Sequence, residues 1–219
     1  MSEGPTDELI RELARDLEPV RPIPPVRRVA LGVLALWGLV ATAGVALRGF
    51  RPDFGERLLM EMGAGGVFAG LATAGVCGVV AALAAAVPGR ERLARGALLA
   101  GAAGLGVAAG IGSFLVVQSP VGDAAPPAAD LVCLGVALAV GFLPALATVW
   151  FAGRALAQRP LAVVLAAAAG TAALGGVTAQ ASCPHADPAH LMLGHVLAPV
   201  AGAVVLTLPL LWALGRLRR

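Results

Sequence analysis

The sequence contains no lysine and no tyrosine, and only 13% of its 219 residues are charged. A soluble domain of this length needs roughly a quarter of its residues charged to cover its surface, so this composition excludes a soluble globular protein. All 16 basic residues are arginine, and together with 29 glycines and many alanines they reflect a GC-rich genome. The net charge of +3 is therefore poor evidence for nucleic-acid binding, and no direct nucleic-acid partner is expected.

Motifs for catalysis are also missing. The chain has no zinc-protease His-Glu-x-x-His, no phosphate-binding glycine loop, no serine at a nucleophile elbow and no paired carboxylates. It also lacks the Cys-x-x-Cys pair, or the histidine pairs on facing helices, that a redox protein would use. We therefore expect no enzymatic activity, no cofactor and no small-molecule substrate.

Long apolar runs dominate the sequence, which is 58% hydrophobic with a mean hydropathy of +0.86. A helix needs ~20 apolar residues to cross the hydrocarbon core. The fifth run is rich in alanine and glycine and only marginally apolar, so it is expected to insert as a hairpin with its neighbour, and five spans is the alternative count. The prediction is an all-α polytopic membrane protein with about six transmembrane helices packed in the lipid bilayer. The predicted spans are 29–47, 63–87, 96–117, 131–152, 161–181 and 191–214, within a transmembrane domain of residues 29–219.

The distribution of arginine predicts the orientation. Thirteen arginines lie in the N-terminal segment, the even-numbered loops and the C-terminus, whereas only Arg48, Arg51 and Arg57 flank the opposite ends of the spans. Because cytoplasmic loops carry an excess of basic residues, both termini are expected in the cytoplasm of a bacterium, with the chain in the inner membrane. The first run is not a cleavable signal peptide, because arginines follow it where small residues would be needed.

Glycines four residues apart recur within the predicted spans. Examples are Gly66-x-x-x-Gly70 and Gly106-x-x-x-Gly110. Such spacings let helix backbones approach closely. No carboxylate lies deep in a span, and no span is broken in matching halves, although ion-coupled transporters often show these features. A small transporter is therefore the second hypothesis, and a structural subunit of a membrane complex is the third.

Residues 1–28 form the only sizeable polar segment, and part of it has a helical pattern. Thr6 is a plausible N-cap, and Pro19 and the prolines after it end the helix. Apolar residues recur at helical spacing and form one stripe. The members of the stripe are Leu9, Ile10, Leu13 and Leu17, and the acidic residues of the opposite face are Asp7, Glu8, Glu12 and Asp16.

The charge of this segment favours a protein partner. Residues 1–20 contain six acids and two arginines, giving a net charge of −4. A helix that lies on the negative cytoplasmic leaflet is normally basic, and three turns are too few for a stable isolated helix. Folding into a groove of a basic partner fits this pattern. The alternative is a helix that folds back onto the basic cytoplasmic loops of the same chain.

Two of the three cysteines are predicted to lie at the outer membrane face. Cys77 falls inside the second span and is expected to be a packing residue. Cys133 begins the fourth span and Cys183 ends the fifth. The outer compartment is oxidising, and a disulfide between Cys133 and Cys183 is within reach if the two helix ends are neighbours.

All three histidines, His185, His190 and His195, lie in the same outer region. Two thiols with imidazoles could bind zinc, cadmium or copper, which makes Cys133, Cys183 and these histidines candidate metal ligands. Their spacing matches no standard zinc motif, and His190 and His195, five residues apart, are not expected to share a helix face. The alternative is that Pro184 turns the loop and the histidines are only interfacial.

These features together resemble the NrsF-like integral-membrane anti-sigma factors. The residues that carry the resemblance are the N-terminal helix pattern over 7–21, Pro24-Pro25, Arg27-Arg28, the six spans, Cys133, Cys183-Pro184-His185 and His195. A light-responsive anti-sigma factor of carotenoid synthesis is similar in size.

The resemblance implies a function. The N-terminal segment would hold an extracytoplasmic-function sigma factor at the membrane, and a stress or light signal would release it. Cys133 and Cys183, with His185 nearby, would be the sensor or redox residues. The stripe at Leu9, Ile10, Leu13 and Leu17 would then be the partner-binding surface, with the acidic residues steering the sigma factor.

Overall fold

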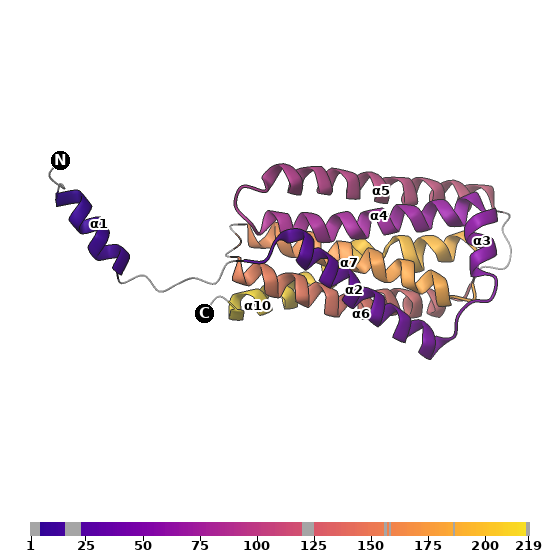
Figure 1. The fold of residues 1–219 in the computed structure, drawn as a ribbon. Coiled ribbons are helices and arrows are strands. Elements are labelled where there is room, and N and C mark those ends of the chain that lie inside the picture. Colours follow the sequence, from indigo (N-terminus) through magenta and orange to yellow (C-terminus); the bar gives the residue numbers. More distant parts are fainter. Residues whose placement is uncertain are drawn as a thin grey trace.

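A computed structural model of the chain describes residues 5–15, 23–119, 125–155, 157, 159–185 and 187–217, and these contain helices and no strands. The helices follow one another along the chain and form one bundle, with α1 apart from it (Figure 1). Their bounds are α1 Pro5–Arg15, α2 Val26–Arg48, α3 Phe54–Met60, α4 Met62–Ala85, α5 Glu91–Gln118, α6 Pro127–Arg154, α7 Pro160–Ser182, α8 Pro188–His190, the π-helix η1 Leu191–Val196, α9 Ala198–Val205 and α10 Thr207–Leu217.

Six segments of the described chain are long and apolar enough to cross a membrane, which confirms the predicted all-α class and span number. They are α2, α4, α5, α6, α7 and the segment Pro188–Val205. The first five lie within a few residues of the predicted runs.

The sixth span differs from the single helix predicted over 191–214. It consists of α8, η1 and α9 in succession, and α10 follows after Leu206. Pro199 stands in the first turn of α9 and Pro209 in the first turn of α10. A proline lacks the N–H that would bond four residues back, so the regular helix is interrupted before each of them.

The marginally apolar fifth run is α7, and it lies at the centre of the bundle. In its most apolar window 72% of the residues are buried, compared with 11% for α2 and 17% for α5. It packs mainly against α4, α6 and α9. Alanine and glycine suit a helix that is surrounded by other helices, which explains why this run needs little lipid-facing hydrophobic bulk.

Glycines do bring helices together, but only some of those predicted. A Cβ on Gly70 would lie 2.6 Å from the Gly104 carbonyl oxygen, so α4 and α5 touch through their backbones. The predicted pair Gly106 and Gly110 has nothing within 4 Å, and for this pair the prediction was wrong. The buried row of α5 consists instead of Gly101, Gly104, Ala108 and Gly112.

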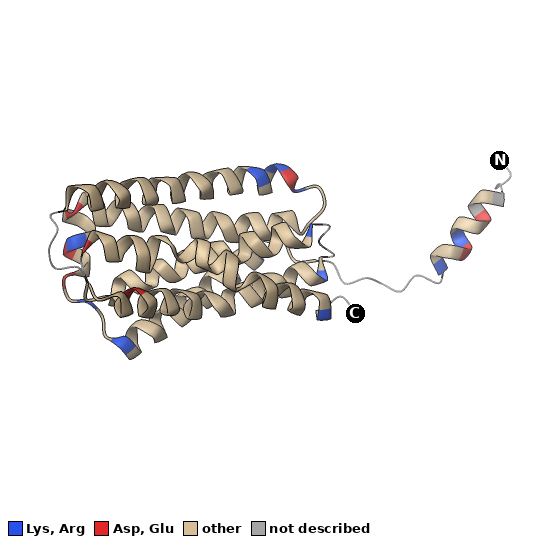
Figure 2. Ribbon diagram, turned by 180° about the vertical axis from the view of Figure 1, so that it is seen from behind, with Lys and Arg blue, Asp and Glu red and all other residues tan. Residues whose placement is uncertain are grey.

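The described charged residues gather at the two ends of the bundle (Figure 2). The start of α2, the α4–α5 turn and the end of α6 share one end; α3 and the α7–α8 connection share the other (Figure 1). At the first end two tryptophans each lie beneath a guanidinium, Trp150 under Arg154 at 5.0 Å and Trp212 under Arg216 at 4.8 Å. Successive spans therefore begin at opposite ends of the bundle, as the predicted orientation requires. Which end faces the cytoplasm stays a prediction.

Candidate cysteine and histidine site

The predicted stripe of α1 is exposed in the structure. Leu9 is 55% exposed, Ile10 58% and Leu13 63%. The helix begins at Pro5, so Thr6 lies inside the first turn and the N-cap prediction for Thr6 was wrong. Pro5 suits that first position because its fixed φ is helical and a first-turn N–H has no helical acceptor. Two further predicted contact residues, Asp16 and Leu17, lie outside the described residues.

At the opposite end of the bundle, α6 and α7 bring two cysteines together. Cys133 lies in the second turn of α6, and Cys183 is the residue after α7, where Pro184 follows. The Sγ atoms are 3.4 Å apart, and the Cys133 thiol donates to the Cys183 sulfur. Both are free thiols and both are buried. The two helix ends are therefore neighbours, which is the condition for the disulfide considered above, and a disulfide would need the sulfurs to approach to about 2.05 Å.

Two histidines complete a cluster with these cysteines. His190 ends α8 and His195 lies in η1, and both are almost fully buried. One donor atom from each of Cys133, Cys183, His190 and His195 lies within 4.8 Å of the others, and His190 Nε2 is 3.1 Å from Cys183 Sγ.

The prediction that His190 and His195 would not share a face was wrong, and the backbone gives the reason. In an α-helix residues five apart point in different directions, whereas a π-helix is wound with i→i+5 hydrogen bonds. Because residues 191–196 form such a turn, the two imidazoles meet edge to face with ring centroids 5.2 Å apart. Gly194 makes room for them, since a Cβ there would lie 3.2 Å from the His190 ring and 3.3 Å from the Cβ of Cys133.

Each buried histidine is held by a hydrogen bond that its Nδ1 donates to a neighbouring acceptor. His190 Nδ1 donates to Asp130 Oδ1 at 2.6 Å, across from α6. His195 Nδ1 donates to the Gly176 carbonyl of α7 at 3.4 Å. Asp187 caps α8, because its side chain accepts from the backbone N–H of His190 at 2.9 Å. The Nε2 atom of each ring is thereby the nitrogen available for chemistry.

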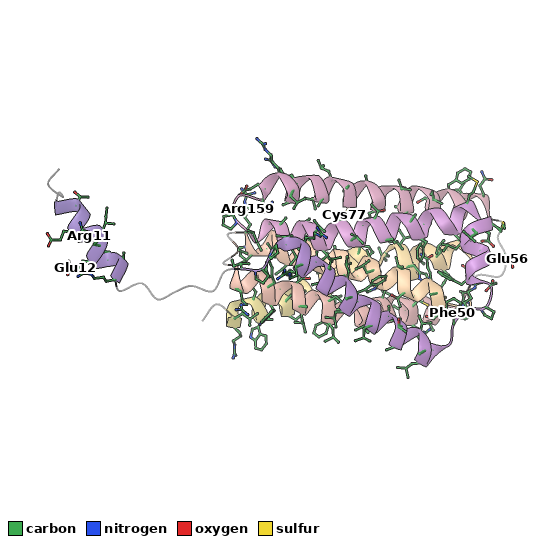
Figure 3. All side chains as sticks on the ribbon, viewed as in Figure 1. Arg11, Glu12, Phe50, Glu56, Cys77 and Arg159 are labelled. Atoms are coloured by element: carbon green, nitrogen blue, oxygen red, sulfur yellow. The ribbon has the colours of Figure 1, made fainter. Side chains whose placement is uncertain are left out.

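His185, which was a predicted sensor and ligand residue, is not one of the four clustered donors. Its ring is half-buried and lies 5.2 Å from the ring of His190. Cys77 lies in the middle of α4, away from Glu56 and Phe50 at the cluster's end of the bundle (Figure 3). It packs against α5, since a Cβ on Gly101 would lie 3.3 Å from the Cβ of Cys77.

Arg51, which sequence reasoning did not single out, binds the cysteine loop. Its guanidinium donates to the carbonyl oxygens of Cys183 at 3.0 Å and His185 at 3.1 Å, and its backbone N–H donates to Ala181 at 2.9 Å. Its position could have identified it, because the loop after the first span is the only predicted outer loop that contains arginine. Asp53 orients the same guanidinium at 2.6 Å, and this hydrogen bond raises the pKa of Arg51 and lowers that of Asp53.

The electrostatics of the loop favour a thiolate at Cys183. The hydrogen bond from the Cys133 thiol lowers the pKa of Cys183, and His195 lowers it further, although burial opposes both. A thiolate is the form of cysteine that attacks oxidants and binds metals. Cys183 is therefore the more reactive sulfur of the pair.

A cavity of about 50 Å³ opens beside the cluster. Cys183, His185 and His195 line it together with Arg51 and Phe54. Gln180, one turn before Cys183, also faces it, and the Nε2 of Gln180 is buried without a hydrogen-bond partner among the described residues. The cavity thus places open space beside Cys183 and His195 of the cluster.

Comparison with known proteins gives a match at the level of a family model. A family model described as "NrsF: Negative regulator of sigma F" matches residues 13–216, most of the chain. Neither the curated proteins nor the solved structures contain a match to the chain.

Proposed function

The chain belongs to the NrsF family of negative regulators of sigma F, and from that premise we propose that it is an anti-sigma factor of the bacterial inner membrane. It holds an extracytoplasmic-function sigma factor through α1 and releases it when a stress signal reaches the Cys133–Cys183 pair. Both termini are cytoplasmic in this proposal, and the chain binds and releases its partner without catalysis. A light signal is the alternative input.

The observation that carries the proposal is the exposed apolar stripe of α1. Leu9, Ile10 and Leu13 are each more than half exposed, and Figure 1 shows α1 apart from the bundle. A short amphipathic helix of this kind gains stability by inserting its apolar residues into a partner's groove. Burying three such side chains would contribute at most about 1.5–3 kcal/mol each, before the costs of association and of ordering the helix.

The acidic residues near the stripe supply a second element of recognition. Residues 1–20 carry a net charge of −4. A sigma factor has to bind DNA, whose phosphates attract basic surfaces, so an acidic helix competes for such a surface. Glu8 and Glu12 are both exposed on α1 (Figure 3 labels Glu12). Complementary charge of this type mainly increases the rate of association.

The outer cluster is linked to α1 through α2. Arg51 follows the outer end of α2 and binds the loop that holds Cys183, while α1 precedes its inner end. Only Ala30 and Val33 of α2 are buried, so this helix is held less firmly than its neighbours. A change at Cys183 would therefore be passed to the helix that carries the sigma-factor contact.

Oxidation is the simplest chemistry for release at this pair. The Cys183 thiolate would attack one oxygen of a hydroperoxide-class oxidant, breaking the O–O bond, releasing an alcohol and leaving a sulfenic acid on Cys183. The Cys133 sulfur would then displace the sulfenic hydroxyl as water. The two thiols lose two electrons and two protons, and one S–S bond forms. The bond draws the sulfurs from 3.4 Å to about 2.05 Å, which pulls the loop that Arg51 binds.

The decisive experiment is capture by the full-length protein, solubilised from bacterial membranes, with Leu13→Asp as the test variant. The wild type should recover an extracytoplasmic-function sigma factor, identified by mass spectrometry. Leu13→Asp places a charge in the stripe and should reduce recovery at least tenfold.

Arg15→Gln is the matched control, because it makes the same one-unit change of charge on the opposite face of α1 and should leave recovery within about twofold. Equal recovery by Leu13→Asp and wild type would contradict the proposed contact. Recovery of no sigma factor by any variant would favour the transporter hypothesis.

A further inference from the structure

We propose that Cys133, Cys183, His190 and His195 are the four ligands of one divalent zinc-class ion. Two thiolates and two imidazoles are a donor set that zinc binds tetrahedrally in proteins, and S₂N₂ sets favour zinc over magnesium or calcium. The four donors come from α6, from the residue after α7, from α8 and from η1. The sequence spacing hides the site because the ligands meet only across these elements.

The distances fit a tetrahedral ion after small movements. Zinc–sulfur bonds of about 2.3 Å and zinc–nitrogen bonds of about 2.0–2.1 Å give donor–donor edges of roughly 3.4–3.8 Å. The Cys133–Cys183 edge is 3.4 Å and the Cys183–His190 edge is 3.1 Å, and no edge exceeds 4.8 Å. Shifts of about 1 Å or less therefore place an ion at the centre of the cluster.

A second, independent observation is that Nδ1 of each ligand histidine is hydrogen-bonded to an acceptor. A ligating histidine almost always donates its other ring N–H to a carboxylate or a backbone carbonyl. His190 donates from Nδ1 to Asp130, and His195 donates from Nδ1 to the Gly176 carbonyl. His190 thus presents Nε2 to the Cys183 sulfur at 3.1 Å, and the bond to Gly176 leaves Nε2 of His195 as its ligand atom, as metal binding requires.

The site is closed on most sides, and the cavity supplies one entrance. All four ligands are at most 3% exposed. Cys183 and His195 line the cavity. Binding one ion displaces the thiol protons and balances the thiolate charge with the two positive charges of the metal. The buried ion would add a link between three helical segments, whereas a disulfide would join only α6 and α7.

The ion and the disulfide exclude each other, because both use the Sγ electron pairs of Cys133 and Cys183. An occupied site therefore protects the thiols, and loss of the ion exposes them to oxidants. This last consequence deepens the proposed sensor role and rests on it. Metal binding itself needs no sigma factor, so the two proposals fail separately.

The test uses the full-length protein in detergent, reduced and freed of metal by a chelator, with Co²⁺ as the spectroscopic probe. We expect one Co²⁺ per chain with sulfur-to-cobalt charge-transfer absorption, and stoichiometric displacement by Zn²⁺. Cys133→Ser, Cys183→Ser, His190→Gln and His195→Gln should each weaken binding by more than ~100-fold, above the 10–100-fold cost of losing an outer-shell partner.

Two matched variants control for the chemistry of the substitutions. His185→Gln removes an imidazole that is 5.2 Å from His190 but outside the donor set, and Cys77→Ser removes the distant thiol. Both should bind one Co²⁺ with wild-type affinity. For variants that fold poorly, thiol protection in the wild type is the second readout: Zn²⁺ should slow alkylation of Cys133 and Cys183 but not of Cys77.

Binding of less than one ion per chain by the reduced wild type would overturn the assignment. So would unchanged affinity in His190→Gln and His195→Gln, or equal Zn²⁺ protection of all three cysteines. A preference for Cu⁺ over Zn²⁺ by the same four residues would overturn the choice of a divalent zinc-class ion.

Discussion

Replacing Arg51 with methionine should expose Cys183. The guanidinium donates two hydrogen bonds to the loop carbonyls of Cys183 and His185, at 3.0 and 3.1 Å. Methionine keeps an apolar stem but removes both donors, so the loop opens more often and its buried thiol becomes accessible to a maleimide. The backbone bond from residue 51 to Ala181 is retained, which confines the effect to the loop.

The magnitude follows from the two lost bonds. A hydrogen bond to a charged group contributes about 1.5–3 kcal/mol, and we take the lower value because Asp53 shares the Arg51 charge at 2.6 Å. Two bonds then contribute about 3 kcal/mol. Since 1.4 kcal/mol corresponds to a factor of ten, the open fraction of the loop should rise about 100-fold.

The assay is maleimide labelling of the reduced, metal-free protein, followed by peptide mass spectrometry, with Cys77 as the internal reference. Arg57→Met is the matched control. Arg57 has a 20% exposed side chain and donates side-chain hydrogen bonds at 2.9 and 2.7 Å to Glu61, which is not part of the cysteine loop. Labelling of Cys183 should accelerate in Arg51→Met alone. An unchanged Cys183 to Cys77 ratio, or an equal rise in Arg57→Met, would refute the reasoning.

Two other substitutions test the site and the packing. Asp130→Asn should weaken Co²⁺ binding by about 10–100-fold, because it removes the carboxylate from His190 Nδ1; wild-type affinity in a titration would show that this carboxylate does not support the ligand. Gly104→Ala should destabilise the protein by about 1–3 kcal/mol in detergent unfolding, since its Cβ would lie 2.8 Å from the Gly70 oxygen, whereas Gly106→Ala has nothing within 4 Å and should be neutral. Similar unfolding midpoints for both alanine variants would contradict this account of helix packing.

The spans and the cysteine pair could be predicted from the sequence because each depends on a local or topological rule. Hydropathy identifies a run long enough to cross a membrane, and alternation of the runs places Cys133 and Cys183 at one end. Residues 6–15 also show their amphipathic pattern directly, and the structure confirms a helix there, at Pro5–Arg15.

The prediction for the glycines of α5 failed because it depends on how the helices pack against one another. Glycines at a spacing of four mark a helix face but do not say which face meets a neighbour, and α5 carries one row at Gly101, Gly104 and Gly112 and another at Gly106 and Gly110. In the first row Gly101 and Gly104 meet α4 and Gly112 meets Met192 of η1, whereas the second row has nothing within 4 Å. The error was to treat every glycine row as a contact.

The relation between His190 and His195 could not be read from spacing, because spacing arguments assume one helical period. The π-turn replaces that period for residues 191–196 and turns two divergent imidazoles into neighbours. Pro199 interrupts the α-helical bonding just beyond it. Arg51 was missed for a related reason: its partners are backbone carbonyls, which carry no residue signature.

The position of α2 explains how a site at one end of the bundle can act on α1 at the other. Besides Arg51, α2 is bonded to α7 at Trp37, whose Nε1 lies 3.1 Å from the Leu174 oxygen and 3.2 Å from the Thr178 hydroxyl. Thr178 lies in the same helix as the residues leading to Cys183. A helix of 23 residues is about 34 Å long and moves as a rod when few side chains anchor it. In the proposed mechanism, a shift of the Cys183 loop therefore moves α2 along α7, and the segment that presents Leu9 and Leu13 moves with it.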